Sequence, residues 1–183
     1  MATIAVDPSD INCILVNSNL SFAEQNFHGT HEFIHTVSCS KNRGQTFSCF
    51  DTVRPHQNSY IEWIANEGAA ELLVPYKQLL PLIKKHYPDL IQDLGTYSFC
   101  EEYADSFTVS PTVLQNRIDS LKYEIHQHIS GIEIEDIQIL SKKAQEGKGI
   151  LLKSLVALEN DRVSEWFSHF KSPVTTSSQA LYI

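Results

Sequence analysis

Two histidines and a glutamate stand close together in the segment His31–His35, which reads His-Glu-Phe-Ile-His. Positions four residues apart lie about one turn apart on one face of a helix, so the imidazoles of His31 and His35 can converge on one metal ion. Glu32 follows the first histidine and can take a proton from a water molecule beside that metal. The segment therefore favours a helix that presents two candidate metal ligands and a candidate base together.

The spacing H-E-x-x-H is the signature of zinc peptidases, in which the metal polarises a carbonyl group and activates water. The alternative is an amphipathic helix that merely carries two surface histidines. Catalytic zinc usually takes three protein ligands and keeps one position open. A third ligand elsewhere in the chain would therefore favour the metal site.

The candidate third ligand is Glu62, near the start of a second predicted helix that ends just before Pro75. Apolar residues spaced at three and four give this helix a buried stripe, and Glu62 lies next to it. Asn66 follows one turn later and is predicted to brace a metal ligand. Glu62 could instead form a capping box with Ser59, whose S-x-x-E spacing it fits. One carboxylate cannot easily serve both roles, and of the two we favour the ligand. A helix that begins earlier, at Arg54-Pro55, would remove the conflict.

The order of these motifs resembles the ImmA/IrrE family of metallopeptidases over roughly residues 11–121. The family pattern has a strand ending in Asn, a Phe four residues before H-E-L-G-H, and a later run E-x-E-A-N-x-F-A-A-E-L-L-M-P. The matching residues are Ile14-Leu15-Val16-Asn17, Phe27, His31 to His35, Glu62, Ala65-Asn66 and Ala70-Glu71-Leu72-Leu73-Val74-Pro75. The departures from the pattern include Ile34 for Gly, Ile64 for Glu and Gly68 for Phe.

The resemblance implies a zinc endopeptidase in which His31, His35 and Glu62 hold one zinc and Glu32 is the general base. It implies an α+β fold, with a small zincin-like core of a short sheet, the active-site helix and the glutamate helix. It also implies a protein substrate, a helix-turn-helix transcriptional repressor that is cleaved or inactivated in a stress or mobile-element response. Two alternatives stay open: a non-catalytic antirepressor that keeps the peptidase fold, and a DNA-binding regulator.

Residues 102–121 predict two short helices around a small core, with Ser110 as an N-cap and Pro111 in the first turn. This shape resembles a helix-turn-helix, and the family carries a similar segment after its core. A DNA-reading helix normally lies in a basic field. Here Arg117 is accompanied by several acidic residues. We therefore favour packing or substrate docking over DNA contact.

The 183 residues include 14 basic and 22 acidic ones and carry a net charge of −8. This charge argues against direct binding to nucleic acid or a membrane surface, and suits a basic protein partner. No apolar run approaches the roughly 20 residues that span a bilayer, and residues 1–8 lack the pattern of a signal peptide. The four cysteines show no C-x-x-C pairing. We expect a cytoplasmic protein.

Three segments are predicted along the chain: a zincin-like metallopeptidase core at 1–88, a helix-turn-helix-like helical subdomain at 89–130, and a C-terminal extension of unknown role at 131–183. A capping box at Ser21 opens the active-site helix, which is predicted to run to about Val37. Apolar spacing and prolines further predict strands at 11–17, 46–50 and 132–137, and helices at 76–86 and 150–170.

Overall fold

The computed structural model describes residues 2–6, 12–38, 47–48, 59–92, 95–150, 152 and 155, with backbone only for 2–6, 12 and 47–48. The chain divides into two compact units, Met1–Ile139 and Leu140–Ile183. The first unit is mostly helical with a small sheet, which is compatible with a small α+β zincin-like domain. The division at residues 88 and 130 stays a prediction of the sequence. No described helix is both long and apolar enough to cross a lipid bilayer.

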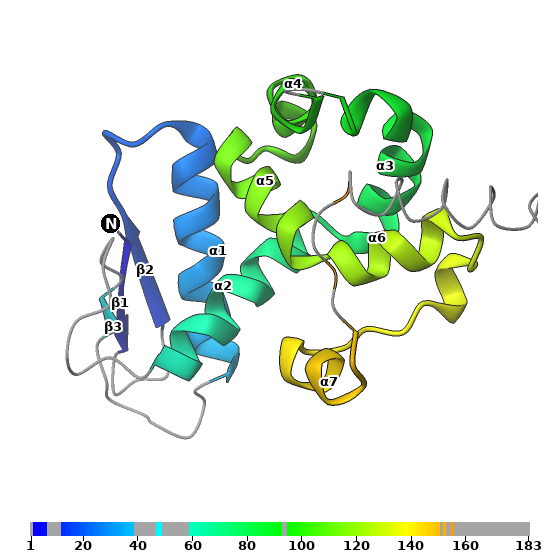
Figure 1. The fold of residues 1–183 in the computed structure, drawn as a ribbon. Coiled ribbons are helices and arrows are strands. Elements are labelled where there is room, and N and C mark those ends of the chain that lie inside the picture. Colours follow the sequence, from blue (N-terminus) through cyan, green and yellow to red (C-terminus); the bar gives the residue numbers. More distant parts are fainter. Residues whose placement is uncertain are drawn as a thin grey trace, which may run out of the picture. The chain divides into compact units, whose positions relative to one another are not determined.

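A three-stranded antiparallel sheet lies at one side of the first unit (Figure 1). Its order is β2 (Asn12–Val16), β1 (Ala2–Val6) and β3 (Phe47–Ser48), so β1 is central. Ile4 pairs with Ile14 on one side and with Phe47 on the other. The strand predicted at 11–17 is confirmed as β2. The strand predicted at 46–50 is confirmed at the two residues that the structure describes.

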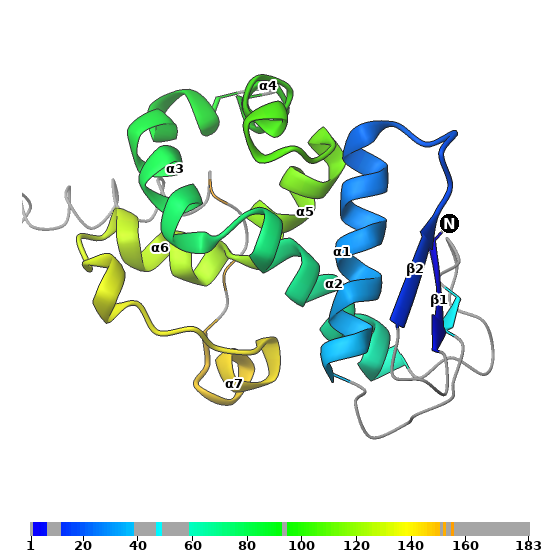
Figure 2. The same ribbon diagram turned by 180° about the vertical axis from the view of Figure 1, so that it is seen from behind.

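Helix α1 (Phe22–Ser38) carries the H-E-x-x-H segment and packs against β1, β2 and α2 (Ser59–Leu73). Both views place α1 between the sheet and the other helices of this unit (Figures 1 and 2). The Ser21 backbone N–H donates to Glu24 Oε2 at 2.8 Å, and the Glu24 N–H donates to Ser21 Oγ at 3.3 Å. The predicted capping box is therefore confirmed, and it fixes where α1 begins.

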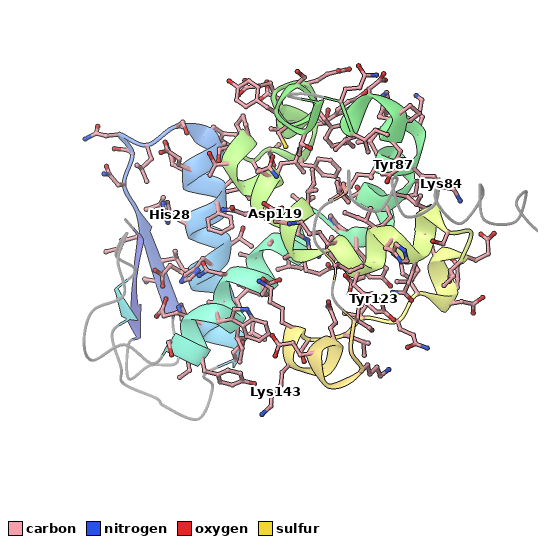
Figure 3. The ribbon with its side chains drawn as sticks, in the orientation of Figure 1. His28, Lys84, Tyr87, Asp119, Tyr123 and Lys143 are labelled. Carbon is pink, nitrogen blue, oxygen red and sulfur yellow. The ribbon has the colours of Figure 1, made fainter. Side chains whose placement is uncertain are left out.

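Helix α3 (Tyr76–Leu90) is longer than its sequence predicts. We expected an end near His86, because a proline lacks the N–H of the helical ladder and its ring crowds the preceding turn. The helix instead continues through both Pro81 and Pro88. Its buried side chains, which include the aromatic Tyr87 labelled in Figure 3, hold it against the core across both prolines. The buried residues are Leu79, Leu80, Ile83, Tyr87 and Leu90.

The next elements are α4 (Gly95–Tyr103), the short 3₁₀ helix η1 (Ala104–Phe107), α5 (Pro111–Ser120) and α6 (Lys122–Ile129). Ser110 caps α5 by accepting the Val113 N–H at 3.3 Å, and Pro111 stands in its first turn, as predicted. The predicted small core is largely buried, whereas Phe107 is half-buried. Its buried members are Ala104, Val109, Leu114, Ile118 and Leu121.

The strand predicted at 132–137 is wrong, because residues 134–136 form the 3₁₀ helix η2 (Ile134–Asp136). Gly131 has a φ of 100°, in the left-handed region, and turns the chain away at the end of α6. The Gln127 side chain then bonds the backbone of Gln138 twice, donating to its carbonyl at 2.9 Å and accepting its N–H at 3.0 Å. Those two bonds hold the segment against α6. The second unit contains α7 (Lys142–Gly147), and the helix predicted at 150–170 lies outside the described residues.

Candidate metal centre

The two histidines of the H-E-x-x-H segment lie on the buried face of α1. His31 is 1% exposed and His35 is 2% exposed, and their Nε2 atoms are 3.0 Å apart. Glu32, between them in sequence, is 0% exposed. Surface histidines on an amphipathic helix would be solvated, so the structure excludes that alternative.

Glu62 projects from α2 onto the same two imidazoles. Its Oε2 lies 3.3 Å from His31 Nε2, and its Oε1 lies 3.5 Å from His35 Nε2. Taking one donor atom from each residue, all three lie within 4.8 Å of one another. Two imidazole nitrogens and one carboxylate oxygen are a donor set that zinc enzymes use, with a fourth position open for water or substrate. These three residues fit a catalytic metal ion.

Asn66 lies one turn after Glu62 on α2 and contacts the other nitrogen of His31. His31 Nδ1 is 2.9 Å from Asn66 Oδ1, a distance at which the Nδ1–H donates to the amide oxygen. That bond leaves the lone pair on His31 Nε2, the atom that faces Glu62 and His35. Asn66 thus orients the His31 ring, which is the kind of contact that metal-bound histidines usually make.

Burial lowers the pKa of both histidines below the ordinary value of 6.5. For His31, the charge of a protonated His35 lowers the pKa further, while the carboxylate of Glu62 acts in the opposite direction. Glu62 also opposes the effect of burial on the pKa of His35. Because both pKa values lie below 6.5, both imidazoles are neutral at neutral pH, which is the form that binds metal.

Acidification is expected to weaken metal binding and the metal-free fold together. The unfolded histidines take up protons below about pH 6.5 while the folded ones resist, so the free energy of unfolding of the metal-free protein falls as the pH falls through that range. Displacing two protons raises the metal dissociation constant by up to about 100-fold per pH unit below both pKa values. Chelator competition between about pH 8 and pH 5 measures this. An affinity that already falls steeply between about pH 8 and pH 7, above the ordinary pKa of histidine, would contradict the assignment of neutral histidines.

Ile34 of α1 and Gly68 of α2 face each other where the two helices meet. A Cβ atom added at Gly68 would lie 3.0 Å from Ile34 Cγ2 and 3.1 Å from its Cγ1 and Cδ1, closer than ordinary van der Waals contact. Both residues depart from the family pattern, which has Gly and Phe at these positions. In the family pattern the large side chain of this contact belongs to α2. In this chain it is Ile34 on α1, which fits the space beside Gly68. This packing leaves Glu62 in contact with both histidines.

The substitution Gly68→Phe is expected to destabilise the metal-free protein by about 1–3 kcal/mol, because it overpacks the contact with Ile34. Ile34→Gly in the same chain should recover about 1 kcal/mol or more of that loss, measured as the coupling energy of a double-mutant cycle in urea. Gly147 is the control position, since among the described residues a Cβ there meets no atom within 4 Å outside its own helix. Gly147→Ala and Ile34→Gly should simply add. If the effects of Gly68→Phe and Ile34→Gly on the free energy of unfolding also add, Ile34 does not compensate for the glycine at position 68.

The sequence alone did not predict the structural role of Arg117. It is 4% exposed, its Nε–H donates to the Val74 carbonyl at 3.2 Å, and its guanidinium is paired with Glu67 and Glu71 at the end of α2. Glu71 and Arg117 both belong to the patterns that carry the family resemblance, and this was the available signal. Arg117 therefore joins α5 to the helix that bears Glu62.

These side chains define a candidate metal centre of the type that zinc metallopeptidases use. The chain belongs to the peptidase family described as the IrrE N-terminal-like domain, whose model matches residues 3–119. This confirms the resemblance to the ImmA/IrrE family and gives the chain a metallopeptidase-type domain. No curated protein and no solved structure matches the chain significantly.

Proposed function

We propose that the protein is a zinc-dependent endopeptidase that cleaves or inactivates a helix-turn-helix transcriptional repressor in a stress or mobile-element response. The observation that carries the catalytic part is the convergence of His31, His35 and Glu62 from two helices onto one buried point. Membership of the peptidase family also supports a metallopeptidase activity. The repressor rests on the family resemblance, and the acidic chain, with a net charge of −8, suits a basic partner.

In this proposal His31, His35 and Glu62 hold about one zinc ion per chain, and Asn66 keeps the His31 ring in place. Bound zinc supplies a Lewis acid that polarises the scissile carbonyl and activates water. Glu32 takes a proton from the attacking water and passes it to the leaving amine. Its position on α1, directly after His31 and shielded from solvent, suits this role, because a base in a dry site transfers protons without competition from bulk water.

Metal analysis of the purified chain tests the centre directly. About one zinc per chain is expected, and His31→Ala or Glu62→Ala should each remove most of it, because catalytic sites depend on all three ligands. His126→Ala is the matched control, since His126 lies on α6 and is outside the cluster of the three donors. Absence of zinc from the unaltered protein after reconstitution would overturn the enzyme reading.

Incubation with a candidate repressor tests the partner. The zinc-loaded protein should either cleave the repressor or abolish the binding of the repressor to DNA. A protein that holds zinc yet neither cleaves nor binds any cognate repressor would overturn this part of the proposal and leave the metal centre intact.

A further inference from the structure

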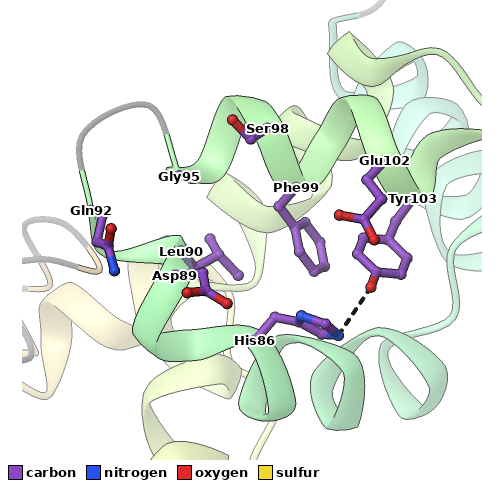
Figure 4. Close-up of a pocket in the computed structure, with 9 residues that line it drawn as sticks. All are labelled: His86, Asp89, Leu90, Gln92, Gly95, Ser98, Phe99, Glu102 and Tyr103. Carbon is purple, nitrogen blue, oxygen red and sulfur yellow. Dashed lines mark hydrogen bonds between the residues drawn. The ribbon is translucent and has the colours of Figure 1, made fainter.

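A pocket of about 250 Å³ lies between α3 and α4, formed by elements other than the metal ligands' helices. Its walls include the rings of His86, Phe99 and Tyr103 and the carboxylates of Asp89 and Glu102 (Figure 4). The pocket is smaller than the roughly 300–1,000 Å³ typical of small-molecule sites. It has room for the end of one long side chain.

The aromatic part of the pocket is an ordered cluster. Phe99 and Tyr103 have ring centroids 4.8 Å apart with an interplanar angle of 36°, and the His86 ring lies 5.1 Å from the Tyr103 ring. The Tyr103 hydroxyl and His86 Nε2 are 3.0 Å apart and share a hydrogen bond. The cluster thus holds flat aromatic surfaces in fixed positions at the pocket wall (Figure 4).

The pocket is lined by negatively charged side chains. Asp89 reaches it from α3 and Glu102 from α4 (Figure 4), and among the described residues that line it none carries a fixed positive charge. Burial first, and then the nearby carboxylate of Glu102, raise the pKa of Tyr103. The Glu102 carboxylate lies beside the Tyr103 ring (Figure 4). That combination attracts a flat cation, which stacks on the ring and donates to carboxylates.

Gly95 determines how closely the start of α4 approaches the end of α3 beside the pocket. A Cβ atom at Gly95 would overlap the carbonyl oxygen of Asp89, so only glycine lets the start of α4 approach the end of α3 this closely. The Gly95 N–H donates to the Gln92 carbonyl at 2.9 Å, and the Thr96 hydroxyl donates to the Leu90 carbonyl at 3.3 Å. The pocket is therefore built by backbone packing.

We propose that this pocket binds the guanidinium group of an arginine residue presented by a protein partner. Guanidinium is planar and carries several N–H donors, so it can stack on an aromatic ring of the pocket while it donates to a carboxylate of the pocket wall, Asp89 or Glu102. The compact, strongly hydrated ammonium of lysine fits this combination less well. The small volume and the acidic chain favour an arginine within a basic protein over a larger free ligand.

Titration of the full-length, zinc-loaded protein with N-acetyl-arginine methylamide tests this, with the NMR signals of Phe99 and Tyr103 as the readout. Saturable shifts are expected, with a dissociation constant on the order of millimolar. The citrulline analogue, which has nearly the same shape without the charge, should bind at least about 10-fold more weakly. Equal binding of the two analogues, or no saturable shift for the arginine analogue, would overturn the proposal.

The double substitution of Asp89→Asn and Glu102→Gln should weaken arginine binding by about 10-fold, because it removes both charges and keeps the side-chain size. Glu101→Gln is the matched control, since Glu101 is exposed on the same helix and does not line the pocket; it should change binding less than about twofold. An equal loss in the control would mean that the binding depends only on net charge. Free arginine that binds at least about 10-fold more tightly than the blocked form would replace the protein partner with a small ligand.

Discussion

Replacing Glu32 with glutamine is expected to lower the rate of peptide hydrolysis by about 10²–10⁴-fold, while the chain still binds about one zinc ion. Glutamine has nearly the same size as the 0% exposed glutamate, so the packing of α1 should be preserved. It cannot take up a proton from the attacking water or deliver one to the leaving amine. Turnover of a cognate repressor under single-turnover conditions, together with zinc content, measures both effects.

Glu24→Gln is the matched control for this substitution. Glu24 lies on the same helix, is exposed and forms the capping box with Ser21, and a glutamine can form that box as well. We expect its turnover to stay within about twofold of the unaltered protein. A Glu32→Gln protein that still cleaves at the normal rate would contradict the role of Glu32 as the base.

The same variant separates the enzyme from a non-catalytic antirepressor. If the protein acts only by binding, Glu32→Gln should release a repressor from DNA as well as the unaltered chain does, without cleavage in either case. If it acts as a peptidase, release and cleavage should be lost together. The departure of Ile34 from the family pattern, within the H-E-x-x-H segment, is a reason to suspect an inactive site. The structure weakens that reason, because Ile34 packs into the space beside Gly68.

The parts of the site that sequence predicts well are those fixed by local rules. Helical spacing places His31 and His35 on one face, and the capping box at Ser21 sets the start of α1. Glu62 could be proposed because zinc needs a third ligand and its helix has a clear apolar stripe. The family pattern then joined helices whose contact no local rule could predict.

The parts that sequence predicts poorly depend on contacts between distant residues. Pro88 should end α3 by local rules, yet the buried apolar face of that helix carries it on to Leu90. The alternating residues 132–137 suggest a strand, but the bonds between Gln127 and Gln138 determine their course. The contact between Ile34 and Gly68 is equally invisible without the structure, because each residue looks like a separate departure.

Arg117 is the clearest such case, and replacing it with methionine is expected to destabilise the protein by about 2–4 kcal/mol. Methionine keeps the apolar stem but leaves the buried Val74 carbonyl without the Nε–H donor and removes the pairs with Glu67 and Glu71. Both glutamates are partly exposed, so their ion pairs contribute less than a buried pair would. Urea denaturation of the metal-free protein measures the loss.

Lys122→Met is the control, since Lys122 pairs with Asp119 at 2.8 Å on the surface, and such a pair contributes only about 0–1 kcal/mol. The comparison also tests whether α5 reads DNA. A DNA-contacting arginine would be exposed, and its loss would weaken salt-dependent retention on DNA while stability stayed unchanged. Arg117 instead lies against the end of the helix that carries Glu62. We therefore expect its loss to reduce stability and, through α2, the affinity for zinc; full stability with reduced DNA retention would favour the regulator over the peptidase.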